Sequence, residues 1–284
     1  MPKYLNTIAK LVTKPILARN TQFREIHNGK TCYIMGEGPS LKYFDLGLFA
    51  DYPTIGINHF FMHKDIGKMN IKYAVIPEPY SFYPFIYNCY SNTYIRNELG
   101  KLCKSEIKRL GYIDWFTSLS NIFAGLPKNN TFYMHHFGHR DPNPNYLDID
   151  GVFSYMRGGL YTAIGLAAFM GFRKARLIGC DYVFRPNETG YFWAKPNEQH
   201  ENKEIRGSGG KSTNTYAHLF SSIKNILEIS TISPAGQKAW IPSIDYATLT
   251  GAKPTYREYD EIVCAPHLNK MRLAYKTGQI ISEM

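Results

Sequence analysis

The sequence lacks the cysteine patterns of metal ribbons and of disulfide-stabilised folds. Its five cysteines are odd in number, lie far apart and form no CxxC pair, which argues against a zinc ribbon and fits reduced thiols in a cytoplasmic protein. No apolar run is long enough to cross a bilayer, and the N-terminus has no compact apolar segment of a secretory signal. We therefore expect a cytoplasmic protein, or one that is peripheral at the inner face of the membrane.

The sequence also lacks a dense Lys/Arg run, a nucleic-acid motif, internal repeats and low-complexity tracts. These absences disfavour a dedicated DNA or RNA binder and a repeat architecture. The net charge is nevertheless +10, with a pI near 9.2, and this excess predicts an anionic partner. A phosphorylated small molecule and an anionic lipid surface both fit that charge.

The first thirty residues form a basic leader. Within it, residues 4–19 read YLNTIAKLVTKPILAR and combine aliphatic side chains with lysine and arginine but no acid. Such a segment is typical of a helix on an anionic membrane surface. Because Pro15 interrupts it, a helix packed on the protein is an equally good interpretation, and both remain open.

The rest of the chain has the composition of a globular α/β protein. It has 284 residues, 44% of them hydrophobic, which is enough for one large domain. Short apolar runs bounded by glycine or proline predict strands at 31–35 and 54–57 and a third ending at Pro77, with a helix from Ser40 to Phe49. This order predicts a Rossmann-like parallel sheet with flanking helices.

Later segments continue the α/β pattern. The block RGGLYTAIGLAAFMGFRKARLIGCDYVF predicts a helix of small residues at 159–170 and a buried strand at 175–178. Residues 185–215 contain hardly any aliphatic side chain, which predicts a lid loop. The lid would interrupt one nucleotide-sugar-binding domain, with residues 31–184 before it and the remainder of the domain with the C-terminal tail at 216–284 after it. Further helices are expected at 97–110 and 215–228, and further strands at 131–135 and 229–232.

The turn GEGPS follows the first strand and precedes the expected helix. Strand-to-helix turns of this kind present backbone N–H groups and a helix N-terminus to a phosphate. Glycines at Gly36 and Gly38 would let a ligand approach the backbone, and Ser40 would cap the helix. The turn is neither GxGxxG nor a P-loop, so a simple tight turn remains an alternative.

Polar residues also follow two other strands. Asn58 and His59 come after the second strand, and Asp181 and Tyr182 come after the strand at 175–178. Ligands of open α/β sheets bind outside the carboxyl ends of the strands. The sequence therefore predicts one crevice that is shared by these strand ends and the GEGPS turn.

Taken in order, GEGPSLK, INHFF, the glycine-helix-strand block and ISPAG resemble the motifs of the bacterial sialyltransferases of glycosyltransferase family 42. The resemblance runs from about Thr31 to Gly236. It implies a GT-A-like variant of the Rossmann sheet and transfer of sialic acid, Kdo or another nonulosonic acid from a CMP-activated donor. It further implies inversion at the anomeric carbon, no metal or other cofactor, and a glycan or glycolipid acceptor of lipooligosaccharide or capsule.

The resemblance also implies site residues. Arg157 and the histidines His200 and His218 would be catalytic, with His200 as the first candidate for the base. Contacts with the donor would come from Gly36, Glu37, Gly38, Pro39, Ser40, Asn58, Glu78, Gly159, Asp181, Tyr182, Tyr191 and Ser233.

The sequence departs from the family pattern at several of these positions. Glu37 and Glu78 stand where the family has asparagine, and Val183 stands where it has a second phosphate-binding tyrosine. The lid histidine of the family has no ungapped counterpart. These departures keep open a non-catalytic nucleotide-sugar-binding module and a metal-dependent enzyme of the pyrophosphokinase or flagellin-glycosylation type.

One histidine-rich stretch raises the question of a metal site. The stretch MHHFGHRD holds His135, His136 and His139, but it predicts no helix and lacks the glutamate of HExxH, so we expect no metal there. The expected partners are the CMP-sugar, the acceptor and an anionic membrane surface, with no nucleic acid. A homo-oligomer remains an alternative to a monomer.

Overall fold

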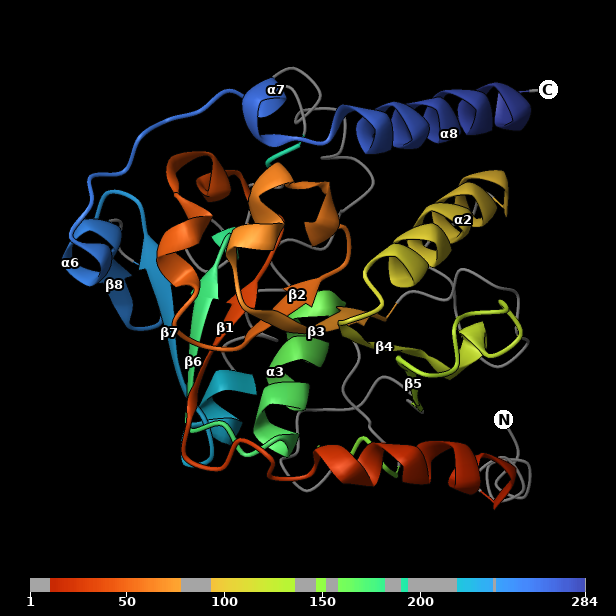
Figure 1. Ribbon diagram of the computed structural model, residues 1–284, viewed down its shortest axis with the longest axis horizontal. Coiled ribbons are helices and arrows are strands. Elements are labelled where there is room, and N and C mark those ends of the chain that lie inside the picture. The colour runs from red at the N-terminus through yellow and green to blue at the C-terminus, as the bar shows by residue number, and fades with distance from the viewer. Residues whose placement is uncertain are drawn as a thin grey trace.

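The computed structural model describes residues 11–77, 93–135, 147–151, 158–181, 190–193, 219–236 and 239–283. These residues form one eight-stranded sheet in the order β5-β4-β3-β2-β1-β6-β7-β8, and every neighbouring pair of strands is parallel. Figure 1 shows the sheet at the centre of the molecule with helices around it. The predicted parallel α/β fold is confirmed.

The strands match the short apolar runs of the sequence closely. β1 and β2 have the predicted bounds, and β3, β5, β6 and β7 lie within two residues of the predicted positions. β4 and β8 had no counterpart in the sequence prediction. The strands are β1 (Thr31–Met35), β2 (Thr54–Ile57), β3 (Ile71–Ile76), β4 (Asp114–Ser118), β5 (Thr131–Met134), β6 (Lys174–Ile178), β7 (Glu228–Ser233) and β8 (Ser243–Asp245).

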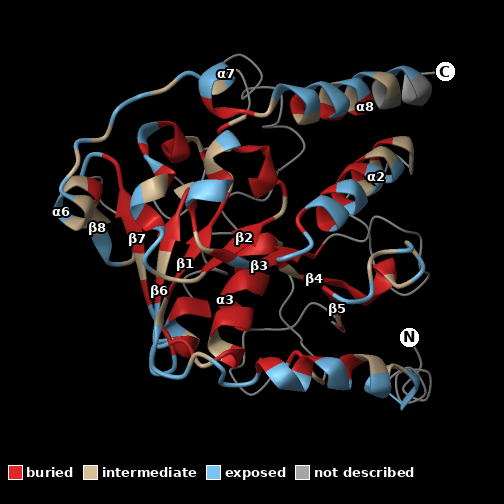
Figure 2. Ribbon diagram, viewed as in Figure 1, coloured by how far each residue is buried: buried red, intermediate tan, exposed pale blue. Residues whose placement is uncertain are grey.

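Alternate side chains of each strand enter two separate apolar layers. In β1, Cys32 and Ile34 belong to one buried cluster, whereas Tyr33 and Met35 belong to the other. Both faces of the sheet are therefore covered, as all-parallel sheets require. Figure 2 shows the resulting buried core along the sheet, with exposed residues on the outer surfaces of the helices.

Helix α3 (Gly159–Phe169) covers the first of these layers. It packs against β1, β2 and β3, and nearly all of its residues are buried because, apart from Thr162, it consists of glycine, alanine and aliphatic or aromatic side chains. Gly171, with φ +79°, lies at its C-terminal end. The predicted small-residue helix is confirmed.

The connection between β1 and β2 differs from the expected helix at 40–49. It contains two short 3-10 helices, η2 (Pro39–Tyr43) and η3 (Leu46–Phe49). The backbone turns extended at Phe44 and Asp45, and the Asp45 carboxylate accepts a hydrogen bond from Gly47 N to begin the second helix. A continuous α-helix was therefore the wrong prediction here.

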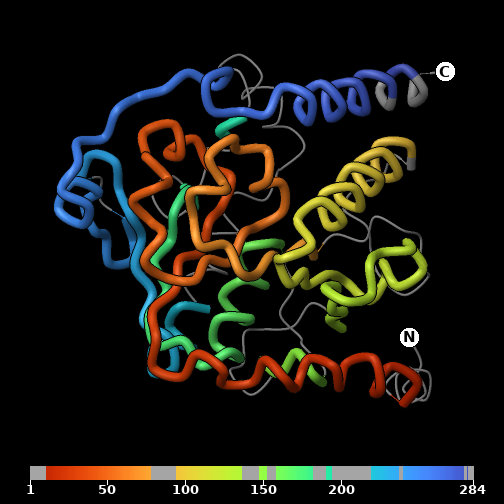
Figure 3. The backbone as a smooth tube through the Cα atoms, in the orientation of Figure 1, coloured from red at the N-terminus to blue at the C-terminus, as the bar shows by residue number. Residues whose placement is uncertain are grey.

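The C-terminal segment crosses back over this connection. Arg257 donates to Phe44 O and forms an ion pair with Asp65, both at 2.7 Å, while Thr255 N donates to Tyr43 O at 3.2 Å. Further along, Cys264 N donates to Met62 O at 2.7 Å. In Figure 3 this segment runs in blue along the top of the view, above the orange residues that follow β2.

Two long helices pack together beside the sheet. They are α2 (Thr93–Arg109), which covers the helix predicted at 97–110 except for its last residue, and α8 (Ala265–Glu283), which was not predicted. A contact of 2.9 Å joins His267 Nε2 of α8 to the buried carboxylate of Glu106 in α2. Two smaller helices, α6 (Tyr246–Thr250) and α7 (Tyr259–Ile262), precede α8.

One further helix prediction was only partly right. Residues 219–223 are helical, but the chain turns at 224–226 and Glu228 already begins β7. The helix predicted to reach Glu228 therefore ends about five residues earlier. Its first residues, 215–218, lie outside the described part of the chain.

The basic leader packs on the body of the protein from Leu17 onward. The Phe23 ring contacts the rings of Phe116 and Phe132 at centroid distances of 4.9 and 4.6 Å, and Asn20 donates to Tyr133 O at 2.8 Å. Residues 11 and 12 are exposed, and residues 1–10 are not described. None of the helices in the described ranges combines the length and apolarity of a membrane span.

Candidate functional site

The order of the strands creates one switch point, between β1 and β6. From β1 the chain proceeds to β2, β3, β4 and β5 on one side, while β6, β7 and β8 lie on the other. The connections that leave the carboxyl ends of β1 and β6 therefore run in opposite directions. Open α/β sheets bind their ligands in the crevice that such a divergence creates. The residues in question are Gly36 to Ser40 after β1 and Gly179 to Asp181 after β6.

The two turns at this switch point pack directly on each other. Gly36 N donates to Ile178 O and Gly38 N donates to Gly179 O, both at 2.7 Å. A Cβ at Gly36 would lie 2.9 Å from the Cys180 sulfur, and one at Gly38 would overlap the Asp181 carboxylate. The glycines are therefore required by contact between the two turns.

The same packing engages the backbone groups that were expected to cradle a phosphate. The N–H groups of Gly36 and Gly38 already donate to backbone carbonyls, and Ser40 donates from both N and Oγ to Asp181 Oδ2, each at 3.2 Å. Ser40 thus binds Asp181 instead of capping an α-helix, and Pro39 begins a 3-10 helix of five residues. These groups of the turn thus already have hydrogen-bond partners within the protein, and those of Ser40 hold Asp181 in place.

Glu37 links the turn to the end of β2. Its carboxylate accepts a hydrogen bond from Asn58 Nδ2 at 3.1 Å, from His59 N at 3.3 Å and from His59 Nδ1 at 3.2 Å. The side chains of Glu37 and His59 are only 10% and 8% exposed. The turn after β1 and the turn after β2 are therefore joined through one nearly buried carboxylate.

The protonation of His59 follows from these contacts. Burial disfavours the charged ring, but hydrogen bonds with the Cys103 and Glu37 side chains outweigh it and raise the pKa of His59 to about 10. The ring is thus an imidazolium at neutral pH, paired with the Glu37 carboxylate. Sequence reasoning placed His59 at the strand end but gave it no role.

Asn58 adopts a conformation that L-residues rarely adopt. Its φ is +50°, in the left-handed region where asparagine is tolerated better than most residues. Its Oδ1 is buried and has no hydrogen-bond partner among the described residues. Gly159, the first residue of α3, lies against it: a Cβ there would be 3.1 Å from Oδ1 and would overlap Ile57. Strain and an unpaired polar atom of this kind are typical of functional sites.

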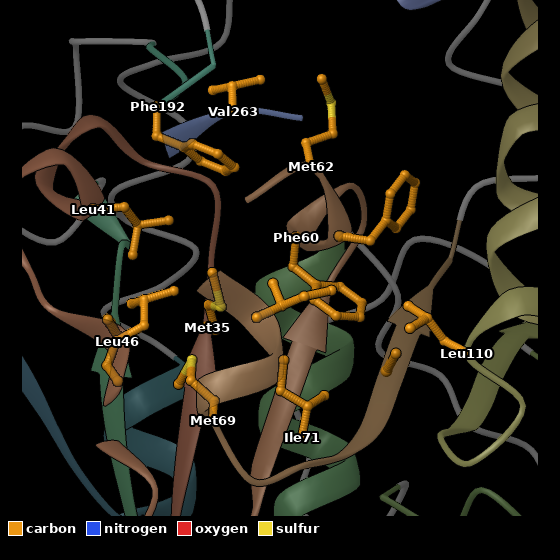
Figure 4. Packing of buried hydrophobic residues seen from close by; sticks show 14 of the residues in the cluster. Met35, Leu41, Leu46, Phe60, Met62, Met69, Ile71, Leu110, Phe192 and Val263 are labelled. Atoms are coloured by element: carbon orange, nitrogen blue, oxygen red, sulfur yellow. The ribbon is translucent and has the colours of Figure 1, made fainter. Parts of the chain in front are cut away.

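Residues 190–193 form another wall beside the turn. Phe192 N donates to Glu37 O at 2.9 Å, and the fully buried Phe192 ring lies 5.3 Å from the His63 ring. Figure 4 shows the Phe192 ring directed into the same apolar group as Leu41 and Val263. Tyr191 is therefore held next to Glu37, as its predicted site role requires, and its ring stacks on Trp193 at 4.3 Å.

A cavity of about 460 Å³ adjoins the site beneath α2, and we call it the α2 cavity. Ile76 and Thr117, at the carboxyl ends of β3 and β4, line its floor, and Cys103 and Lys104 of α2 line its wall. The contact between Cys103 and His59 places this cavity beside the Glu37–His59 pair. Its volume is in the range of small-ligand pockets.

The predicted site residues are brought together in part. Gly36 to Ser40, Asn58, Gly159, Asp181 and Tyr191 gather at the switch point, and Ser233 ends the neighbouring strand β7 and is buried. The other predicted residues, Glu78, Arg157, Tyr182, His200 and His218, lie outside the described residues, as do Val183, His136 and His139. No cluster of three or more metal-binding side chains occurs in the described ranges.

The sequence matches no protein-family model and no curated protein. Among solved structures, the MAf glycosyltransferase from Magnetospirillum magneticum AMB-1 is 11% identical with a TM-score of 0.44, over 92% of this chain and 42% of that one. This chain therefore spans less than half the length of that protein.

Two sialyltransferase structures are similar to the same extent. The sialyltransferase CST-II in complex with a trisaccharide acceptor and CMP is 13% identical with a TM-score of 0.45, over 86% of this chain and 99% of that one. The sialyltransferase CstII from Campylobacter jejuni in complex with CMP-3FNeuAc is 14% identical with a TM-score of 0.43, over the same shares. Similarity at these values assigns neither a family nor an activity to this chain.

Proposed function

We propose that this protein is a glycosyltransferase that binds a CMP-activated nonulosonic acid at the switch point between β1 and β6. The proposal rests on one observation above all. The motif resemblance assigns Glu37, Asn58 and Asp181 to the donor. These residues come from three separate strand ends, and they lie at the switch point, where this sheet topology favours a ligand.

The proposed reaction is an inverting transfer. An acceptor hydroxyl oxygen bonds to the anomeric carbon while the bond from that carbon to the phosphate oxygen breaks, and CMP leaves with the electron pair. A base takes the hydroxyl proton. By resemblance, His200 or His218 is that base, Arg157 acts at the reacting centre, and Tyr191 donates to the departing phosphate. We propose that no metal ion takes part.

The acceptor requires a place beside the donor. The α2 cavity adjoins the Glu37–His59 pair, and its wall carries Tyr94, Asn97 and Glu98, an aromatic face with amide and carboxylate groups that suits sugar hydroxyls. We therefore place a glycan acceptor, as part of this proposal, in the α2 cavity. A glycolipid acceptor would also bring the basic protein to an anionic membrane.

Isothermal titration with CMP tests the donor class. The parent chain is expected to bind CMP, and Asp181→Asn is expected to weaken binding roughly tenfold, because Ser40 loses its charged acceptor. Asp148→Asn is the matched control, since Asp148 pairs with Arg24 far from the switch point. Absence of CMP binding, or equal effects of the two variants, would contradict the proposed site.

Turnover separates the enzyme from the two alternatives. Release of CMP from a panel of CMP-sugars, with and without a glycan acceptor, is expected to proceed in the presence of EDTA. Binding without any release would indicate a non-catalytic module. The valine at position 183 is consistent with that alternative, because it cannot donate to the departing phosphate. Release that requires magnesium would favour an enzyme of the pyrophosphokinase or flagellin-glycosylation type.

A further inference from the structure

The Glu37 carboxylate poses an electrostatic problem for the proposed site. It lies in the turn that the motif resemblance places against a nucleotide phosphate, and its side chain is only 10% exposed. Two negative groups close together in a poorly solvated site repel each other strongly. A phosphate ester can bind there only if the carboxylate is neutralised or turned away from it.

The structure provides both conditions through His59. The ring nitrogen Nδ1 and the backbone N of His59 both bind Glu37 Oε1, at 3.2 and 3.3 Å, which turns the carboxylate toward the end of β2. A charged His59 ring leaves the pair with no net charge. We propose that His59 is a positioning residue that supplies the counter-charge of Glu37 and thereby permits a phosphate ester to bind at the switch point.

The surroundings of His59 maintain this charge. Two titratable groups of the described residues contact it from neighbouring elements: Glu37, from the turn after β1, and Cys103, from α2. Together they raise the pKa of His59 to about 10 although burial opposes the charged form. The ring accordingly keeps its charge throughout the neutral range and loses it in alkaline solution.

The same pair fixes the orientation of Asn58. An ionised carboxylate only accepts hydrogen bonds, so the group of Asn58 that faces Glu37 at 3.1 Å must be its amide nitrogen. The Asn58 oxygen is then the amide atom that does not face Glu37, and it stays buried close to Gly159. His59 therefore acts through Glu37 on a residue of the proposed donor site, without itself having to contact the ligand.

Removal of the counter-charge gives a distinctive result. In His59→Gln, Glu37 retains its charge without a cation beside it, and CMP affinity at pH 7.5 is expected to fall roughly tenfold or more.

A double variant and a matched control make the test specific. In Glu37→Gln/His59→Gln two neutral amides replace the ion pair, and CMP affinity is expected to return to within roughly threefold of the parent. His267→Gln removes the histidine of another buried pair, that with Glu106, and should leave CMP affinity unchanged. His59→Gln that binds CMP like the parent, or a double variant that stays as weak as the single one, would overturn the inference.

The inference rests on the proposed function, and the two can fail separately. If the parent chain binds no CMP, both are overturned. If it binds CMP but His59→Gln does so equally well, only the role of His59 is overturned. The ion pair has its own measurement: in an NMR titration, the His59 ring should stay protonated above pH 8 in the parent and lose its proton at lower pH in Glu37→Gln. A parent midpoint near 6.5 would contradict the pair.

Discussion

Replacement of Gly38 by alanine should lower the free energy of unfolding more than the same replacement at an exposed glycine. A Cβ at this position would overlap Asp181 Oδ2 and would lie 2.6 Å from Asp181 Cγ and 2.7 Å from Gly179 O, whereas ordinary carbon contacts are about 3.5 Å or longer. Asp181 would have to move by more than about 1 Å. Such a shift breaks both hydrogen bonds from Ser40 to Asp181.

The expected cost follows from those two bonds. Hydrogen bonds to a charged acceptor contribute about 1.5 to 3 kcal/mol each, and Asp181 is partly exposed, so the lower value applies. Loss of both gives roughly 3 kcal/mol. The backbone at Gly179 can move less than a side chain, because its carbonyl accepts a hydrogen bond from Gly38 N at 2.7 Å. The estimate of roughly 3 kcal/mol is therefore a lower one.

Urea unfolding of the two alanine variants Gly38→Ala and Gly67→Ala measures this cost. Gly67 is the matched control, since it lies in the 3-10 helix η5 (Lys64–Lys68) and a Cβ there would meet no atom within 4 Å. Its substitution should change stability by less than about 0.5 kcal/mol. A change below about 1 kcal/mol for Gly38→Ala would refute the argument that contact between the two turns requires glycine.

Three further substitutions test other contacts. Phe192→Ala should cost roughly 3 to 5 kcal/mol in urea unfolding, because its ring is fully buried; a cost below about 1 kcal/mol would contradict the packing in Figure 4. Burial lowers the pKa of His63 from 6.5 to about 4. Between these two pH values the unfolded chain therefore binds more protons than the folded one. The free energy of unfolding of the parent should fall by roughly 3 kcal/mol as the pH decreases from 6.5 to 4. His63→Asn should lack this part of the pH dependence, and identical profiles would refute it. Arg257→Met should cost roughly 1 to 3 kcal/mol by breaking the ion pair with Asp65, and Asp65→Asn should add little to it in a double-variant cycle.

Elements with strong local signals were predictable from the sequence. β1 and β2 are short apolar runs beside glycine or proline, and α3 is a run of small and apolar residues that ends near Gly171. Helix α8 was missed because its buried side chains are few. Leu268, Met271 and Ala274 are buried at three-residue spacing, while most of the remaining positions are polar.

The site was predictable at the level of strand ends but not of contacts. Asn58 and Asp181 were expected near the GEGPS turn because parallel strands end at one edge of a sheet. The partner of Glu37 could not be inferred, since His59 reaches it only after the left-handed residue Asn58 redirects the chain. The contact between the two turns could not be inferred from the glycines, because a close approach of another turn imposes the same requirement as a close approach of a phosphate.

The C-terminal contacts with the β1–β2 connection have a consequence for biosynthesis. Arg257 binds Phe44 across 213 residues of chain, and Lys42 O accepts from Arg257 N in the same place. At usual translation rates of about 5 to 20 residues per second, the connection waits roughly ten to forty seconds for these partners. During that interval apolar side chains such as Leu41 and Phe44 lack part of their final packing, so the growing chain should depend on chaperones more than its parallel sheet alone would suggest.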